Sequence, residues 1–234
     1  MKKTMWVISF FSLIGTAIVL QIMPENIPMH YDIAGNIDRW GSKFENLIFP
    51  TIIILVSLFW TLLISHYEKK ASNTEAEKES VEARSNAKVL SIVGVSQTAM
   101  FTIMQGFLLY GAYQEAVSGA ARQTIDIGKV SNILLGVLCI ILGNNMTKTR
   151  VNSVVGVRIS WSMYNDHTWR KTNRFGAFAL IIAGILTIIV TVFIKSFLVA
   201  MMATIGVIIM ATTVTVIYAH KVYVLEIQAE KGEK

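Results

Sequence analysis

Residues 175–194 read FGAFALIIAGILTIIVTVFI, residues 197–219 read FLVAMMATIGVIIMATTVTVIYA, and only Lys195 and Ser196 separate the two runs. Neither run contains a charged residue. About 20 apolar residues in a helix cross the roughly 30 Å hydrocarbon core of a bilayer. The two runs therefore predict a pair of membrane-spanning helices joined by a tight turn, and they place the chain among helical membrane proteins.

Towards the N-terminus, further apolar runs of suitable length occupy residues 5–22, 47–66, 88–111 and 125–144. The run at 125–144 carries polar residues near its start, so its apolar centre is short. Continuous apolar runs also argue against a membrane β-barrel, whose strands alternate apolar and polar residues. The predicted fold class is all-α: a polytopic membrane helix bundle with six transmembrane helices.

The composition of the 234 residues agrees with a membrane protein. Hydrophobic residues make up 53% and charged residues 15%, and the mean hydropathy is +0.55. A soluble domain carries about a quarter charged residues, so a soluble enzyme is disfavoured. The single cysteine, Cys139, excludes an intramolecular disulfide and a cysteine-cluster zinc site. The HExxH, GxSxG and P-loop patterns are missing from the sequence, so we expect no enzyme and no cofactor.

The placement of lysine and arginine predicts the orientation of the chain. With the N-terminus inside, the inner segments hold sixteen of these residues and the outer segments hold five. Inner loops of membrane proteins are enriched in basic residues, so both termini are predicted to be cytoplasmic. This asymmetry accounts for the net charge of +6, and we therefore expect contact with membrane lipid and no direct binding of nucleic acid.

The spans and loops predict four parts in sequence order. The connector between the second and third spans mixes five glutamates with four basic residues, which indicates a helical extension or a flexible linker. The parts are an N-terminal two-helix unit at 1–66 with a structured outer loop at 23–46, a charged cytoplasmic connector at 67–87, a four-helix unit at 88–219 with a cytoplasmic basic and aromatic loop at 145–174, and a cytoplasmic tail at 220–234.

The outer loop 23–46 carries signals of a defined shape. Pro24 and Pro28 favour extended backbone after the first helix, and Gly35 permits a turn because glycine adopts positive φ without strain. The loop has four acidic and two basic residues, which suits recognition of an extracellular ligand.

The candidate ligand-binding residues of the outer loop are polar and close in sequence. One histidine and two aspartates are a poor match to any zinc spacing, so we expect no metal and instead expect these side chains to hydrogen-bond to one another. The candidates are His30, Asp32, Asp38 and Lys43.

The inner loop 145–174 contains six basic residues and one acid. The spacing of Trp161, Tyr164 and Trp169 predicts that they share one side of a short helix at an interface, with a helix N-cap in 162–166. Two interpretations remain open: an anchor on anionic lipid, and a docking surface for a cytoplasmic protein or anionic ligand. The candidate partner-binding residues are Arg150, Asn152, Arg158, Trp161, Trp169 and Arg174.

Polar residues also recur within the third span. Ser91, Thr98, Thr102 and Gln105 follow one another at steps that place them on one helix face, whereas Gln97 lies off this face. Small and amide side chains in such a stripe typically hold membrane helices together. No span carries a charge near its middle, which argues against an ion-coupled pump.

Two motifs resemble the SdpI-type immunity proteins of bacteria. The outer loop carries Ile27-Pro28-x-His30 followed by Gly35, Asp38 and Ser42-Lys43, which is similar to the N-terminal membrane domain of that family. The inner loop resembles the second half of the family through Gly143-Asn144, Lys148-x-Arg150-x-Asn152, Gly156-x-Arg158, Trp161 and Trp169-x-x-x-Asn173-Arg174-x-Gly176.

The resemblance implies a multi-pass protein of the bacterial cell membrane that gives resistance to a secreted antimicrobial peptide toxin. It further implies a signalling role in which the protein retains a cytoplasmic transcriptional repressor at the membrane. The alternative is a transporter or membrane enzyme for a small or lipidic anionic substrate. That alternative predicts a deep polar cavity that reaches the midplane of the membrane.

Overall fold

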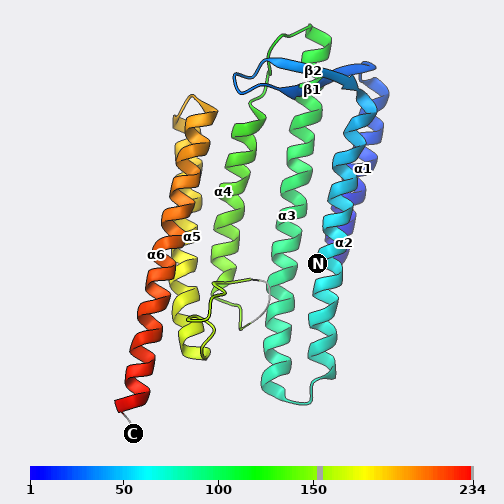
Figure 1. The fold of residues 1–234 in the computed structure, drawn as a ribbon. Helices are drawn as coiled ribbons and strands as arrows, with labels where there is room; N and C mark the ends of the chain where they lie inside the picture. The colour runs from blue at the N-terminus through cyan, green and yellow to red at the C-terminus, as the bar shows by residue number, and fades with distance from the viewer. Residues whose placement is uncertain (152–154, 233–234) are drawn as a thin grey trace. The chain divides into compact units, whose positions relative to one another are not determined.

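A computed structural model of the protein describes residues 1–151 and 155–232. Its described part contains six helices long and apolar enough to cross a membrane, as the sequence predicts. The helices are α1 (Lys2–Ile22), α2 (Ile48–Asn73), α3 (Glu77–Ser118), α4 (Ile127–Met146), α5 (Asp166–Phe193) and α6 (Phe197–Gly232) (Figure 1). The sequence analysis missed three short elements, which are β1 (Asn26–Tyr31), β2 (Ile37–Ser42) and the 3-10 helix η1 (Lys43–Leu47).

Several helices continue beyond the apolar runs. The charged connector is helical except at residues 74–76, because α2 continues to Asn73 and α3 begins at Glu77. Glu77 lies in the first turn of α3, where negative charge is favoured by the helix dipole. Ser80 Oγ donates a hydrogen bond of 2.7 Å to the carbonyl of Ala71 and links the two helix ends. Similarly, residues 220–232 of the predicted tail continue α6 as a helix.

The chain divides into two compact units. The first comprises Met1–Thr61 and Gly94–Leu134, and the second comprises Leu62–Val93 and Leu135–Lys234. The boundaries pass through helices α2, α3 and α4, so each unit takes a segment of each of these helices.

In the first unit, buried hydroxyl and amide groups join α1, α2 and α3. Ser9 and Ser57 lie 2.7 Å apart through their hydroxyl oxygens, and Ser57 lies 3.2 Å from the Thr98 hydroxyl. Gln105 Nε2 donates a hydrogen bond of 3.4 Å to Thr16 Oγ1. Residues of the predicted polar stripe on α3 therefore contact α1 and α2, as expected for side chains that hold helices together.

Gln97, which the sequence places off the stripe, also joins two helices. Its Oε1 accepts a hydrogen bond of 2.8 Å from Trp60 Nε1 on α2. The polar contacts of α3 thus extend over a wider part of its surface than a single line of residues.

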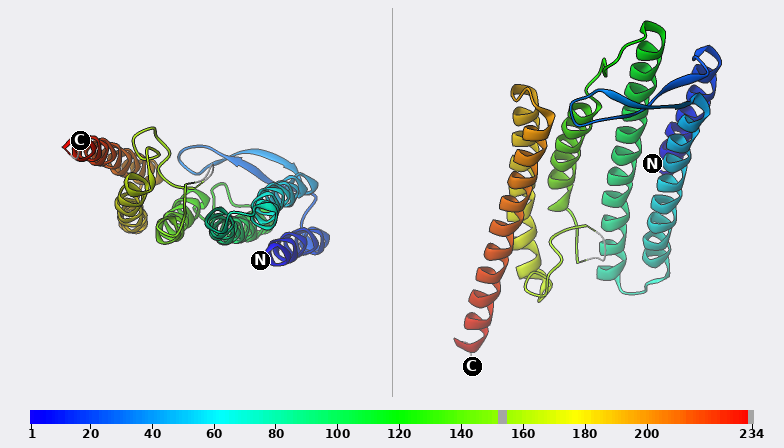
Figure 2. Two further views of the ribbon diagram at one scale, coloured as in Figure 1. Left: turned by 90° about the horizontal axis from the view of Figure 1, so that it is seen from below. Right: turned by 45° about the horizontal axis from the view of Figure 1, so that its top comes forward.

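In the second unit, α5 and α6 run side by side after a tight turn (Figure 2). α5 ends at Phe193 and α6 begins at Phe197, so Lys195 and Ser196 lie in the turn, as predicted. The loop between α4 and α5 belongs to the same unit.

Candidate functional site

A β-hairpin follows α1 and forms the larger part of what we call the hairpin cap, defined as residues 23–47 and 119–126. β1 and β2 pair antiparallel, with a register irregularity around His30. The turn between them has Gly35 at φ 80°, a conformation that favours glycine. Asp32 accepts hydrogen bonds of 2.8 and 2.7 Å from the backbone and side-chain nitrogens of Asn36, which fixes the turn.

The segment after α3 binds the hairpin through its backbone. Ile37 donates a hydrogen bond of 3.0 Å to the carbonyl of Ala121, and Gln123 donates one of 2.8 Å to the carbonyl of Gly35. The Arg122 guanidinium donates a further hydrogen bond of 2.6 Å to the carbonyl of Ala34. Two stretches distant in sequence therefore form one structure (Figure 1).

Glu115 anchors the hairpin cap to α3 and was missed in the sequence analysis. Its side chain is 1% exposed and accepts hydrogen bonds from the Tyr31 hydroxyl at 2.6 Å and from the Thr124 backbone at 2.6 Å. Burial, followed by the hydrogen bond to Glu115, raises the pKa of Tyr31 well above its usual range. An acid directly after an apolar span, in a stretch rich in alanine and glycine, was the available signal.

The four candidate residues of the outer loop divide into three local arrangements. His30 Nδ1 and Asp38 Oδ1 lie 2.6 Å apart on the exposed surface of the hairpin. The hydrogen bonds from Asn36 lower the pKa of the Asp32 carboxyl, which has a separate role in the turn. Within residues 1–151 and 155–232, no group of three or more His, Cys, Asp and Glu residues is arranged to hold a metal ion.

Lys43, the fourth candidate, is buried and contacts the chain itself. Its Nζ donates a hydrogen bond of 3.3 Å to the carbonyl of Met23 and lies 3.0 Å from Glu25 Oε1. Met23 is the C-cap of α1, and a cation is favoured at the C-terminal end of a helix. The structure therefore gives Lys43 a position that stabilises the junction of α1 with the hairpin cap.

Large apolar side chains project from the hairpin cap. Ile33 is 83% exposed, Phe44 is 55% exposed and Trp40 is 46% exposed. A capping box of Ser42 and Glu45 fixes the backbone beside Phe44. The backbone that carries these exposed side chains is held in place by hydrogen bonds.

The second candidate surface is the connecting loop, defined as residues 147–165, between α4 and α5. Gly156 has φ 126°, and a Cβ built on it would lie 2.5 Å from Asn173 Oδ1. The same Asn173 oxygen accepts a hydrogen bond of 2.8 Å from the Val157 backbone. The loop thus packs against α5 at a position where only glycine avoids a clash.

The prediction that Trp161, Tyr164 and Trp169 share one side of a short helix is wrong. Trp169 is 1% exposed, and its Nε1 donates a hydrogen bond of 3.1 Å to the carbonyl of Thr149. It therefore holds the connecting loop and does not face a partner. The first two rings pack on α6 instead, with Trp161 on His220 at 4.6 Å between ring centroids and Tyr164 on a tyrosine of the same helix.

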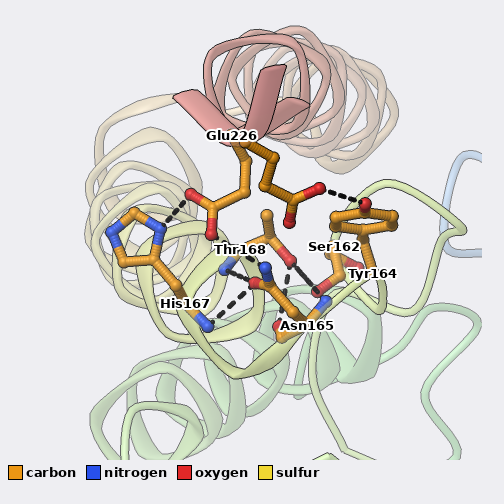
Figure 3. Close-up of polar contacts among 7 residues, drawn as sticks. Ser162, Tyr164, Asn165, His167, Thr168 and Glu226 are labelled. Carbon is orange, nitrogen blue, oxygen red and sulfur yellow. Dashed lines mark hydrogen bonds and ion pairs between the residues drawn. The ribbon is translucent and has the colours of Figure 1, made fainter. Parts of the chain in front are cut away.

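The start of α5 is linked to the C-terminal part of α6 (Figure 3). Asn165 caps α5 by accepting hydrogen bonds from the backbones of His167 and Thr168, which confirms the predicted N-cap in 162–166. Its Nδ2 donates a hydrogen bond of 2.8 Å to Glu226, and His167 Nδ1 lies 2.6 Å from the other oxygen of that carboxylate. This link was not predicted from the sequence, because its partners are about sixty residues apart.

Tyr164 contributes a second link to α6. Its hydroxyl donates a hydrogen bond of 2.8 Å to Glu230 Oε2, and this bond raises the pKa of Tyr164 above its usual value. Residues 220–232 are therefore bound along the connecting loop by side-chain contacts and do not extend freely from the last span.

The candidate basic residues of the inner loop remain at the surface. The side chains of Arg150, Arg158 and Arg174 are exposed, whereas Asn152 lies outside the described residues. The Arg150 backbone donates a hydrogen bond of 3.1 Å to Asn86 Oδ1 on α3, and this bond positions the start of the loop. The structure therefore places the three arginines at the surface of the second unit.

Comparisons with known proteins match both halves of the chain. Residues 148–219 match the SdpI/YfhL protein family, and residues 7–54 match a domain of unknown function, DUF1648. The chain is 21% identical over 198 residues to the Immunity protein SdpI of Bacillus subtilis (strain 168), covering 84% of each chain. No solved structure matches the chain. The connecting loop lies almost entirely within the SdpI/YfhL match, and the chain is similar to the SdpI-type multi-pass proteins of the bacterial membrane.

Proposed function

We propose that this immunity-type membrane protein protects its cell against a secreted antimicrobial peptide toxin, and that the hairpin cap binds the peptide. The observation that carries the proposal is the exposure of Ile33, Trp40 and Phe44 on a backbone held in place by hydrogen bonds. A preorganised surface loses little conformational entropy on binding, and aromatic side chains are frequent anchors of peptide interfaces. The protein acts by binding, without catalysis.

The charges of the hairpin cap indicate the chemistry of the peptide. Residues 23–46 carry four acids and two bases, and Lys43 is buried beside Glu25. The cap is therefore net acidic, with apolar side chains between its charges. It suits a peptide that offers both apolar and basic side chains.

The test is survival of a toxin-sensitive bacterium that expresses the protein. Cells carrying the wild-type chain are expected to keep growth and membrane potential when challenged with the SDP-type peptide. A variant with Ile33→Ser and Trp40→Ser is expected to lose protection, because both replacements remove exposed apolar surface without touching the hydrogen bonds that hold the cap. The amount of protein in the membrane is measured by immunoblot for each strain.

The matched control is Phe193→Ser, which removes an aromatic side chain at the end of α5 that is 79% exposed, close to the 83% of Ile33. This control is expected to protect like the wild type. Protection retained by the double cap variant at normal membrane levels would contradict the proposal. Loss of protection in both variants would also contradict it, because the effect would not belong to the cap.

We further propose that the connecting loop and the start of α5 retain a cytoplasmic repressor at the membrane. The support is the exposure of Arg150 and Arg174, and a loop backbone that is fixed by Trp169 and Asn173. Basic side chains on a fixed surface suit an acidic patch of a protein partner.

Fractionation of the cells tests this second role. In the producing strain exposed to toxin, the repressor is expected in the membrane fraction with the wild-type protein. It is expected in the soluble fraction with the variant Arg150→Gln, Arg174→Gln, while protection persists. A repressor that stays at the membrane with this variant would exclude the connecting loop as its binding surface.

A further inference from the structure

A groove of about 310 Å³ lies between α5 and α6 in the second unit. Its walls are formed by apolar side chains of both helices, and residues 156–159 of the connecting loop line one end. The wall residues include Ala179, Leu180 and Ala183 on α5 and Ile208, Ala211 and Val216 on α6. All six lie within the predicted apolar spans at 175–194 and 197–219, so the groove lies at the depth of the hydrocarbon core.

Two threonines in the groove do not make it polar. Thr212 Oγ1 donates a hydrogen bond of 2.8 Å to the carbonyl of Ile208, and Thr215 Oγ1 donates one of 2.7 Å to the carbonyl of Ala211. Both hydroxyls are therefore bound to their own helix. A ligand in the groove meets mainly carbon atoms, which suits a hydrocarbon chain and not a polar substrate.

Arg158 lines the loop end of this groove, and its side chain is exposed. Within residues 1–151 and 155–232, no carboxylate forms an ion pair with it. Its guanidinium is thus an available cation beside an apolar groove. A guanidinium binds phosphate through two parallel hydrogen bonds and is the preferred side chain for this anion.

The backbone on both sides of Arg158 is fixed. Val157 donates a hydrogen bond of 2.8 Å to Asn173 Oδ1, and the carbonyl of Val157 accepts one of 2.6 Å from Ser162 Oγ. Ile159 donates a hydrogen bond of 3.2 Å to the same Ser162 oxygen, and the Ser162 side chain is fully buried. These hydrogen bonds therefore hold the backbone of Arg158 in place at the end of the groove.

We propose that the groove binds one anionic phospholipid, with an acyl chain between α5 and α6 and the phosphate on Arg158. Charge complementarity selects the anionic headgroup, and the apolar walls select the chain. The site belongs to the second unit and does not depend on toxin binding at the hairpin cap.

Native mass spectrometry of the full-length protein tests the proposal. The protein is purified in detergent and offered an equal mixture of phosphatidylglycerol and phosphatidylcholine. The wild type is expected to retain one phosphatidylglycerol in preference to phosphatidylcholine. Arg158→Gln is expected to weaken that binding about tenfold, because it removes a charge-assisted bidentate contact. Ala179→Phe and Ala211→Phe, which fill the groove and keep the arginine, are expected to weaken it as well.

The control is Arg170→Gln, which removes an exposed arginine from the first turns of α5 without altering the groove lining. It is expected to bind lipid like the wild type, and thermal unfolding shows that each variant is folded. Equal losses in Arg158→Gln and Arg170→Gln would indicate general attraction of lipid and overturn the proposal. Undiminished binding in both groove-filling variants, or equal competition by glycerophosphate, would indicate a headgroup site without a chain and also overturn it.

Discussion

At the scale of single residues, Gly156 shows how one position shapes the connecting loop. Its φ of 126° is a conformation that residues with a side chain rarely adopt. A Cβ there would also lie within 3.0 Å of the Trp169 ring, which is buried. The backbone conformation of the loop around Arg158 therefore depends on Gly156, which lies two positions before it.

Gly156→Ala is expected to lower the stability of the protein by about 1–3 kcal/mol, because the new methyl group forces strain on the loop backbone. Thermal unfolding in detergent measures the change. Gly106→Ala is the matched control: this glycine lies within α3 and nothing lies within 4 Å of a Cβ built on it. The control is expected to be neutral or up to about 1 kcal/mol more stable. Equal unfolding temperatures for the two variants would contradict the expected strain.

Asp32 gives the hairpin turn a pH dependence. Hydrogen bonds from Asn36 lower the pKa of Asp32 in the folded protein below its ordinary value of 3.8. A lowered pKa contributes stability that is complete above 3.8 and is lost as the pH falls through the folded value. The protection of the 32–36 backbone amides, expressed relative to their intrinsic exchange rates at each pH, is therefore expected to fall below about pH 4 in the wild type. The variant Asp32→Asn is expected to show no such fall in protection, and an identical pH profile in both proteins would count against the prediction.

At the scale of elements, the hydroxyl of Ser57 joins three helices of the first unit. It contacts Ser9 on α1 and Thr98 on α3, and its side chain is fully buried. Hydrogen bonds between membrane helices contribute modestly, because the separated helices also find other partners. These hydroxyl contacts consequently determine which faces of α1, α2 and α3 meet, and they contribute less to the stability of the helix bundle.

Ser57→Ala is expected to destabilise the protein by about 0.6 kcal/mol, the average for such contacts, and by no more than about 1.7 kcal/mol. Unfolding by denaturant in mixed micelles measures the loss. Thr51→Ala on the same helix serves as control, because the Thr51 hydroxyl bonds to the Leu47 carbonyl of its own turn and is exposed. A loss as large in the control as in Ser57→Ala would show that the interhelical contact contributes nothing.

The sequence predicts elements far better than it predicts contacts between them. The six spans follow from apolar runs alone, and the N-cap at Asn165 and the turn at Gly35 follow from local chemistry. The hairpin was missed because two short strands with little alternation carry a weak signal. The contacts of Glu115 and Trp169 were not predictable, because their partners lie far away in the sequence and local patterns do not show which distant residues meet.

At the scale of the whole molecule, the membrane orientation remains a prediction from the distribution of basic residues. The sixteen-to-five asymmetry predicts that the hairpin cap is extracellular and the connecting loop cytoplasmic. Ile33 in the cap and Met163 in the loop are both exposed, so each offers a position for chemical labelling. The native cysteine, Cys139, is buried and is replaced by alanine to remove background.

Intact cells expressing Ile33→Cys in this background are expected to react with a membrane-impermeant maleimide. Cells expressing Met163→Cys are expected to react only after the membrane is permeabilised. Mass shift on a denaturing gel measures both reactions, and detergent-solubilised protein provides the full-labelling control for each position. The reverse pattern would invert the orientation and move the proposed peptide-binding surface to the cytoplasm.

The contacts between the hairpin and the segment after α3 have a consequence for biosynthesis. Tyr31 bonds to Glu115, and the carbonyl of Gly35 bonds to Gln123, so roughly eighty residues must be made after the hairpin ends at Ser42 before these contacts can form. Chains emerge from the ribosome N-terminus first, and early segments must wait for later partners. The hairpin therefore stays unanchored until the third helix has been inserted, and a locked hairpin marks a nascent chain whose first three helices are already in place.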